Sequence, residues 1–250
     1  LYEAVAVTML VHEGRLSLDK TLAEYLPQYV GKIQNADKIT LRMMVQHRSG
    51  IPNYVDHPDY PWSNPYKERS QTYELVLGQP SNFDPNSRYQ YSNTNYLLIG
   101  DIMDKTLGYN YHEYIKQRIL EPLGLNSTYS LLSQVDIDDV MSGYFVGYEH
   151  DIKRNDFIQP GGSMVATIED VGVFLRALND GSLLSDEEQA IYSSIYVYEH
   201  TGHLPGYQSI ARYHSDIDAV VVQFTSTSGG NLWQLSEIVY KRIIRILHDE

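Results

Sequence analysis

The spacing of apolar positions along the chain changes once, near residue 195. Before that point apolar side chains recur every three to four residues, as in helices, and after it they follow the two-residue period of strands. Together with cap and turn residues, this pattern predicts helices at residues 1–12, 18–29, 41–47, 72–77, 93–107, 111–120 and from Thr167, Ser185 and Leu232. It predicts strands at residues 144–148, 196–199, 207–214 and 219–225, the last two adjacent and antiparallel.

The first and last predicted helices differ in character. Residues 1–12 are apolar nearly all round and end at Gly14, which is typical of a helix in the middle of a core. This helix begins on Leu1 with no Ser, Thr, Asp or Asn before it, so we expect that an upstream segment of the same protein completes it. The last helix carries an apolar stripe, which predicts that it covers the sheet; the stripe consists of Leu232, Leu235, Val239, Ile243 and Ile246.

Cap residues mark several of the predicted helix starts. Thr40, Asn93, Asn110 and Thr167 each precede a helical pattern, and Ser185 with Glu188 has the spacing of a capping box. The outline is a mostly helical lobe, residues 21–194, followed by strands and a closing helix. This outline predicts an α/β (α+β) fold.

Composition excludes several classes of function. The 250 residues are 42% hydrophobic and 20% charged, which is ordinary for a globular protein. A net charge of -13 repels phosphate backbones and anionic lipid surfaces, so no nucleic-acid partner is expected. No apolar run reaches transmembrane length, and no basic signal-peptide start is visible. The absence of cysteine excludes a disulfide framework and a thiol nucleophile.

The candidate chemistry lies in residues 88–100, RYQYSNTNYLLIG. Tyr91 and Asn93 stand one residue apart where a turn-rich loop meets a helix that ends at Gly108. A phenol and a carboxamide at that place can address one bound group, the phenol as acid or base and the amide as donor. In the alternative interpretation Tyr91 packs, since 22 residues are tyrosine, and Asn93 only caps.

Rival sites are weaker. His200 and His203 are three residues apart, but on a strand their side chains point to opposite faces, and no H-E-x-x-H motif accompanies them, so we expect no metal. Ser163 is one residue short of a G-x-S-x-G motif and is interpreted as a turn residue. His47 and Ser49 are expected to fix the loop after their helix. The glycine spacings indicate neither a Rossmann fingerprint nor a P-loop, and no cofactor is expected.

Four stretches carry a resemblance that covers nearly the whole chain: VHEGRLSLDKTLAEYLP, ITLRMMVQHRSGIP, YQYSNTNYLLIGDIMDKTLGYNYHEYIKQRILEPLGL and HTGHLPGYQSIARYHSDIDAVVVQF. In order and spacing they resemble the serine beta-lactamase and penicillin-binding protein family, which includes class C beta-lactamases, DD-carboxypeptidases, esterases and D-aminopeptidases. The segment PGGSMVATIEDVGVFLRALNDG fits as well. The resemblance implies an antiparallel sheet flanked by helices, with an all-helical lobe inserted between residues 1–20 and 195–250, forming one catalytic unit.

The same resemblance implies roles for individual residues. Tyr91 matches the acid/base tyrosine of the family's Tyr-x-Asn motif, and Asn93 matches the residue that contacts the substrate amide. His200, Thr201 and Gly202 match the Lys-Thr-Gly or His-x-Gly motif on the strand that lines the site, and His203 matches the backbone donor of the oxyanion hole. Acyl transfer needs such a base and such donors.

Two departures from the family pattern matter. The Ser-x-x-Lys motif with the nucleophile belongs at the start of the first helix, so the resemblance places it upstream of Leu1. Residues 17–20, Ser-Leu-Asp-Lys, match it by letter but follow Gly14, outside that helix. His200 stands where beta-lactamases carry lysine, and its weaker charge favours a peptidase or esterase over a beta-lactamase.

The sequence therefore predicts a serine hydrolase that acts through an acyl-enzyme on a peptide, ester or beta-lactam, with a nucleophile outside these 250 residues. The alternative is a catalytically silent relative that binds peptide or muropeptide ligands. Family resemblance alone favours an extracytoplasmic location, periplasmic or on the cell surface.

Overall fold

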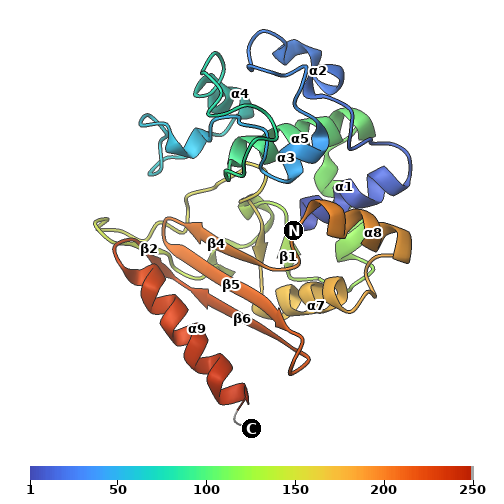
Figure 1. The fold of residues 1–250 in the computed structure, drawn as a ribbon. Coiled ribbons are helices and arrows are strands. Elements are labelled where there is room, and N and C mark those ends of the chain that lie inside the picture. Colours follow the sequence, from blue (N-terminus) through green and yellow to red (C-terminus); the bar gives the residue numbers. More distant parts are fainter. Residues whose placement is uncertain (249–250) are drawn as a thin grey trace.

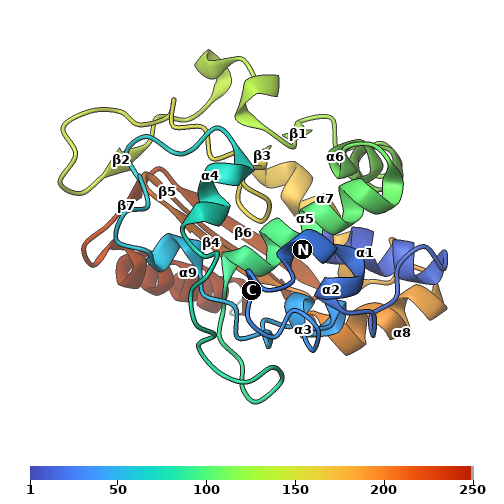
Figure 2. The same ribbon diagram turned by 90° about the horizontal axis from the view of Figure 1, so that it is seen from above.

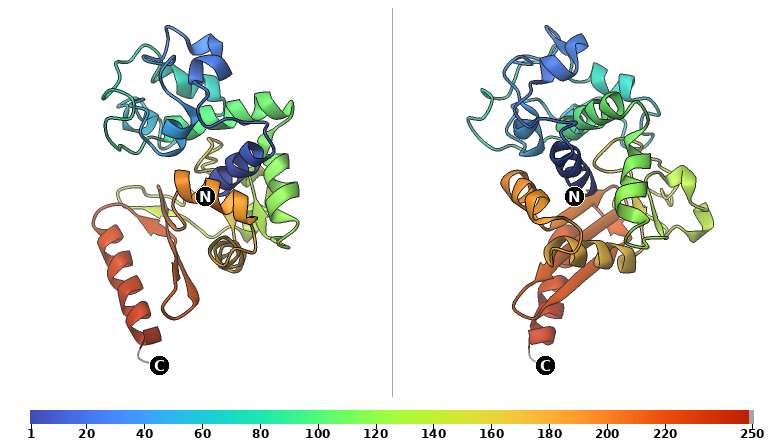
Figure 3. Two further views of the ribbon diagram at one scale, coloured as in Figure 1. Left: turned by 45° about the vertical axis from the view of Figure 1, so that its right-hand side comes forward. Right: turned by 90° about the vertical axis from the view of Figure 1, so that its right-hand side faces the viewer.

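A computed structural model describes residues 1–248 as a group of helices standing beside a three-stranded antiparallel sheet (Figure 1). The sheet has the strand order β4–β5–β6, and α7 and α9 lie on its opposite sides (Figure 3). Most of the other helices lie beyond the β4 edge. Within residues 1–248, no helix combines the length and apolar character that a membrane crossing requires.

Helix α1 (Tyr2–His12) runs through the middle of the core, as predicted. Residues 4–7 and Leu10 have no exposed surface, and the helix packs against α5, α6 and α8. The chain leaves it through Gly14, whose φ of +71° lies in the left-handed region that glycine adopts without strain. The N-terminal end of α1 lies between the helices and β4 (Figures 1 and 2).

The helical part consists of short elements: α2 (Leu22–Tyr25), η1 (Pro27–Tyr29), α3 (Leu41–Val45), η2 (Tyr54–Asp56), α4 (Arg69–Glu74), α5 (Asn93–Leu107), α6 (Tyr111–Ile115), η3 (Lys116–Leu120), η4 (Leu132–Gln134) and η5 (Ile137–Asp139). The caps at Thr40 and Asn110 are confirmed, because their side chains accept from Met43 N–H (3.3 Å) and His112 N–H (2.9 Å).

The single helix predicted at residues 18–29 is wrong. Thr21 and Glu24 form a capping box that starts α2 late, and residues 18–20 form a turn. The helix predicted at 72–77 begins earlier, at Arg69.

The predicted cap of α5 is also wrong. Asn93 is the first helical residue, and its N–H donates to Oδ1 of Asn53 at 2.9 Å. Ser92 occupies the N-cap position without a side-chain cap and donates its hydroxyl to Pro52 O at 3.3 Å. A loop distant in sequence therefore supplies the bond that a local residue was expected to supply. The predicted end at Gly108 is confirmed by its φ of +77°.

Helices α7 (Ile168–Asn179) and α8 (Asp186–Ile195) start as predicted. Thr167 accepts from Asp170 N–H, and Ser185 forms a capping box with Glu188. Two small strand pairs accompany them: β1 (Thr128–Tyr129) with β3 (Val165–Ala166), antiparallel, and β2 (Tyr144–Phe145) with β7 (Thr227–Ser228), parallel. The strand predicted at 144–148 is thus only two residues long.

The main sheet is built from β4 (His200–Leu204), β5 (Tyr207–His214) and β6 (Ala219–Thr225). The bounds and antiparallel pairing of β5 and β6 are as predicted. The strand predicted at 196–199 is wrong, because pairing with β5 begins only at His200. The rings of Tyr196 and Tyr198 pack against Tyr192 of α8 instead.

Helix α9 (Leu232–His248) packs on the sheet through a different face from the one predicted. Ser236 and Tyr240 are its buried residues, and both bond to the sheet. Ser236 Oγ donates to Gln208 Oε1 at 2.6 Å, and the Tyr240 hydroxyl bonds to His214 Nε2 at 2.9 Å. Most of the predicted apolar stripe is exposed, namely Leu235, Val239, Ile243 and Ile246. Within the described residues, α9 lies on the sheet as predicted, but most of its apolar stripe is left uncovered.

Candidate active site

The residues before α5 face the first residue of β4. The ring centroids of Tyr91 and His200 are 6.4 Å apart, and the His200 ring is parallel to that of Tyr196 at 6.2 Å. The structure thus brings together the tyrosine and the strand that the sequence motifs singled out. A hollow of about 630 Å³ lies elsewhere, between residues 30–37 and 78–80, and none of the candidate site residues lines it.

Tyr91 stands on the ring of His47, with ring centroids 4.3 Å apart. Its hydroxyl donates to Asn93 Oδ1 at 3.3 Å, and 39% of the residue is exposed. Packing around the hydroxyl, with smaller effects of Tyr89 and Glu3, raises the pKa of Tyr91 to about 12. Its phenol is therefore protonated at neutral pH and acts as a hydrogen-bond donor.

His47 and Ser49 tie the end of α3 to the start of α5, as expected. Nδ1 of His47 accepts from the N–H of Ser92 at 3.2 Å, and Ser49 Oγ donates to Asn95 Oδ1 at 2.6 Å. His47 has a φ of +55°, which is unusual for a residue with a side chain. Burial, and then the nearby His200, lowers the pKa of His47 to about 4, so this imidazole is neutral. The role of His47 is to fix the backbone at Ser92, next to Tyr91.

His200 is also a neutral residue at pH 7. Burial lowers its pKa, and its Nδ1 lies 2.5 Å from the carbonyl oxygen of Thr201. A carbonyl oxygen can only accept, so Nδ1 carries the proton and Nε2 is left as an acceptor.

Strand β4 is an edge strand with an open side. The two-residue turn after it pairs Leu204 with Tyr207, and such a closing pair exchanges both ladder hydrogen bonds. Because bonded and non-bonded pairs alternate, the N–H groups of Thr201 and His203 are directed away from β5. Gly202 lies between them, where a Cβ would come within 2.4 Å of Ser209 Oγ.

The two β4 histidines lie on opposite faces, as strand geometry predicts. His200 packs with Tyr196, whereas the His203 ring stacks on Trp233 of α9 at 5.9 Å. The His203 side chain is thus turned away from the cluster. Only its backbone can serve the site.

Sequence reasoning missed two residues near this site. Asn53 accepts from both the N–H and the side-chain amide of Asn93, at 2.9 and 3.2 Å. Glu3 is buried, and its Oε1 accepts from the Tyr111 hydroxyl (3.0 Å) and from Gly161 N–H (2.8 Å). Neither carries a local signal, because both act on residues far along the chain. The one signal in the sequence was that Glu3 places a carboxyl group in an otherwise apolar helix.

Ser17 and Ser163, the two serines that come near a nucleophile motif by letter, occupy different surroundings. Ser17 is exposed in the turn after α1, and its N–H donates to the Tyr25 hydroxyl at 2.7 Å. Lys20 packs its ammonium over the ring of Tyr25, at 4.7 Å. The pair is therefore not on one helix face, as the Ser-x-x-Lys geometry requires. Ser163 is buried in the segment before β3.

Comparison with known proteins extends this picture. A putative D-alanyl-D-alanine carboxypeptidase of Escherichia coli (strain K12) is 29% identical over 129 residues, which cover 49% of this chain and 30% of that protein. A penicillin-binding protein of Bacillus subtilis (strain 168) is 26% identical over 164 residues, covering 64% of this chain and 35% of that protein. The chain thus spans about a third of the length of these curated relatives.

Solved structures show the same fold. The D-amino acid amidase of Ochrobactrum anthropi SV3, complexed with D-phenylalanine, matches with a TM-score of 0.81 at 21% identity, covering 98% of this chain and 89% of that one. A D-stereospecific amidohydrolase from Streptomyces sp. matches with a TM-score of 0.79 at 22% identity, covering 90% and 79%. A family model described as Beta-lactamase matches residues 1–194. The chain belongs to this beta-lactamase family, and it shares the fold of the amidase and amidohydrolase structures.

Proposed function

We propose that the intact protein is a serine hydrolase that forms an acyl-enzyme with a peptide, ester or beta-lactam substrate. The observation that carries the proposal is the juxtaposition of Tyr91 with His200 at the start of an edge strand. A site for acyl transfer needs a proton acceptor and backbone donors that converge on one point. The family of the chain and the names of its relatives support this class of chemistry.

Each site residue has a role in this proposal. Tyr91 is the general base, and Asn93 donates its side-chain amide to the substrate. His200, Thr201 and Gly202 form the wall of β4 along which the substrate lies. The N–H of His203, which is directed away from β5, is one donor of the oxyanion hole.

The nucleophile of this proposal is a serine upstream of Leu1, in a Ser-x-x-Lys motif. The N-terminal end of α1 lies between the helices and β4, so a helical turn added before Leu1 extends into the space between Tyr91's side of the molecule and that strand. A lysine there supplies the positive charge that Tyr91 needs, because a pKa of about 12 otherwise keeps the phenol protonated.

We further propose that upstream strands of the same protein complete the sheet. β6 lies at the end of the strand order, and the apolar stripe of α9 is exposed beside it. An uncovered edge and an apolar helix face together favour an added strand. Residues 1–20 and 195–250 then form the α/β lobe of one catalytic unit, and residues 21–194 form the mostly helical lobe.

A silent relative that only binds peptides is the second candidate. One observation favours it: Tyr91 and His200 are both uncharged at neutral pH. Without a cation from upstream, the phenol cannot take the proton of a serine.

The test is to expose the intact protein to a fluorescent penicillin and a fluorophosphonate and to locate the adduct by peptide mass spectrometry. We expect one adduct, on a serine upstream of residue 1, and none on the 250 residues alone. An adduct on Ser17 or Ser163 overturns the proposal. Absence of any adduct, with ligand binding retained, establishes the silent relative instead.

A further inference from the structure

The turn between β5 and β6 and the end of α9 bring three metal-ligating side chains together. His214, Asp216 and His248 each offer one ligand atom, and these three atoms lie within 4.8 Å of one another. His214 ends β5, Asp216 lies in the turn, and His248 is the last residue of α9. We propose that this cluster is a binding site for a divalent transition-metal ion, with Zn²⁺ as the best-matched ion.

The chemistry of the donors matches that ion. Two imidazoles and one carboxylate are a ligand set that Zn²⁺ accepts, with a water molecule in the fourth position. Bond lengths of about 2.0–2.1 Å in a tetrahedron place neighbouring donors about 3.3 Å apart. Nε2 of His248 and Oδ2 of Asp216 are already 3.4 Å apart. The ligand atom of His214 lies within 4.8 Å of the other two, so its partly exposed ring has to approach by at most about 1.5 Å.

The surroundings orient the ligands. The Tyr240 hydroxyl bonds to Nε2 of His214 at 2.9 Å, and Tyr240 itself is buried between α9 and the sheet. A second hydrogen bond to a ligating histidine is the usual means of holding its ring. The net charge of -13 favours a cation. The neighbouring Asp218 is engaged by Arg176 and Tyr213, so it does not compete for the ion.

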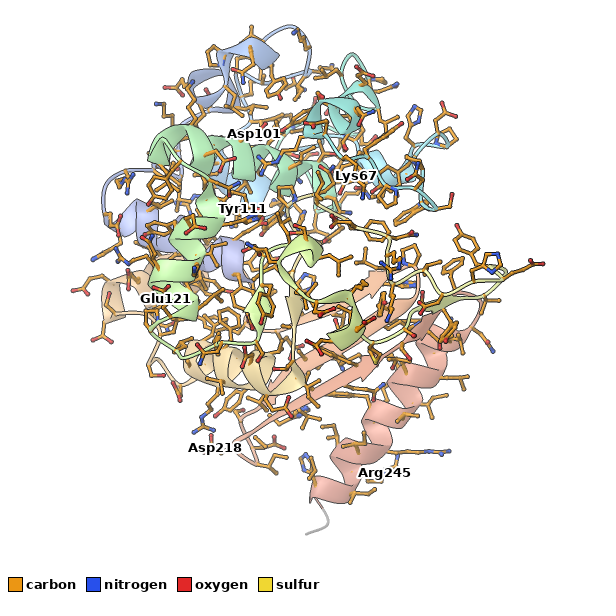
Figure 4. All side chains as sticks on the ribbon, turned by 180° about the vertical axis from the view of Figure 1, so that it is seen from behind. Lys67, Asp101, Tyr111, Glu121, Asp218 and Arg245 are labelled. Carbon is orange, nitrogen blue, oxygen red and sulfur yellow. The ribbon has the colours of Figure 1, made fainter. Side chains whose placement is uncertain are left out.

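This site is separate from the candidate active site. His214 lies three residues along β5 from Ala211, the partner of His200, so strand alternation places the His214 side chain on the other face of the sheet. Figure 4 shows Asp218 at the tip of the hairpin and Arg245 on the last turns of α9. The bound ion acts as a clamp on α9. Only Ser236 and Tyr240 of this helix are buried, both in its first half, whereas Ile246 and Leu247 in its last turn are exposed. An ion bound by His248 together with His214 and Asp216 would attach the C-terminal half of α9 to the β5–β6 hairpin.

The experiment is a calorimetric titration of the metal-free intact protein with Zn²⁺, followed by thermal unfolding with and without the ion. We expect one ion bound per chain. At about ten times its dissociation constant the ion stabilises the folded state about tenfold, which raises Tm by roughly 3–6 °C. Co²⁺ in place of Zn²⁺ should give the visible absorption of a tetrahedral site.

The variants His248→Gln and Asp216→Asn should each weaken Zn²⁺ binding at least tenfold and remove the Tm shift. The side chains of His248 and Asp216 are 38% and 61% exposed and lie outside the core, so the fold tolerates the changes. His57→Gln is the matched control, because Nδ1 of His57 lies 3.9 Å from Asp59 without a third ligand. This variant should bind like the wild type. Equal binding by wild type and His248→Gln, or no binding by the wild type, overturns the proposal.

Discussion

Tyr91 and His200 are both uncharged at neutral pH, for the same physical reason. Each is packed among other rings, and a low-dielectric surrounding disfavours the phenolate of one and the imidazolium of the other. The cluster therefore presents hydrogen-bonding groups rather than charges. A positive charge placed next to Tyr91 would lower the pKa of its phenol and allow it to act as a base.

The variant Tyr91→Phe tests that role. It removes only a hydroxyl whose one bond in the structure is the 3.3 Å contact to Asn93, so folding should be unaffected. Loss of a general base should lower kcat for a chromogenic ester by about two to four orders of magnitude. Steady-state kinetics and a thermal melt of the intact protein measure the two effects. Unchanged turnover in a folded variant rules out Tyr91 as the base.

The variant His200→Lys adds a charge at the start of β4. A cation here should favour carboxylate-bearing substrates over neutral esters by about 1 kcal/mol, the scale of a partly exposed ion pair. Competition between the two substrate types at pH 8 gives the largest difference, because His200 is neutral there. The control is His203→Lys, whose side chain lies on the other face of β4. Equal preferences in all three proteins contradict the assignment.

At the scale of elements, a partly buried polar network joins α1, α4, α5 and α6, and its two parts meet where the N–H of Tyr111 donates to Asp104 Oδ1 at 2.7 Å. Glu3 of α1 accepts from Tyr111 of α6, and Arg69 of α4 bonds to Asp101 and Asp104 of α5 at 2.6 and 2.9 Å. The labelled Asp101 and Tyr111 lie close together in Figure 4. Glu3 also holds Gly161, so the segment before β3 is tied to the helix that leads to the site. Burial raises the pKa of Glu3.

Substitutions of Glu3 test this network. Glu3→Ala leaves the Gly161 N–H without its acceptor and leaves the Tyr111 hydroxyl with His112 Nε2 as its remaining partner, so we expect a loss of roughly 1–3 kcal/mol in the free energy of unfolding. Glu3→Gln keeps the accepting oxygen and should be at least as stable as wild type at pH 8. A raised folded-state pKa means that ionised Glu3 destabilises the fold above the unfolded pKa. The relative gain of Glu3→Gln should therefore shrink toward pH 4.5. The measurement is the free energy of unfolding in urea at pH 8 and pH 4.5 for the wild type and both variants. If Glu3→Gln is as unstable as Glu3→Ala, the network does not hold the fold together.

For the whole molecule, the buried histidines predict sensitivity to acid. The folded-state pKa of His47 is about 4, below its ordinary value of 6.5, so the unfolded chain binds the extra proton between these values. Stability is therefore full above pH 6.5 and falls as pH drops toward 4. The shift corresponds to roughly 3 kcal/mol for this fully buried ring.

The measurement is the free energy of unfolding at pH 7 and pH 4.5 for the wild type and His47→Asn. Asparagine tolerates the positive φ of this position and does not titrate, so the variant should lose less stability on acidification. His57→Asn controls for a histidine that is only partly buried. Parallel pH dependences of the wild type and His47→Asn refute the prediction.

Much of the fold was predictable because the contacts that determine it are local. The caps at Thr40, Asn110, Thr167 and Ser185 each bond two or three residues along the chain, and β5 and β6 are joined by a short turn. The unbroken apolar character of α1 likewise required burial. The site roles of Tyr91, Asn93, His200, Thr201, Gly202 and His203 came from motif resemblance and remain predictions.

Other features of the molecule depend on contacts between segments that are distant in the sequence, and only the tertiary structure shows them. The cap of α5 comes from Asn53, pairing in β4 begins at His200 rather than at 196, and α9 packs through Ser236 and Tyr240 instead of its apolar stripe. The pKa values of Tyr91 and His47 follow from packing that no local pattern records. The sequence by itself determined most of the helices and the pair β5 and β6, since those depend on near neighbours. The fold decided which side chains are buried together, since burial depends on partners that only chain folding supplies.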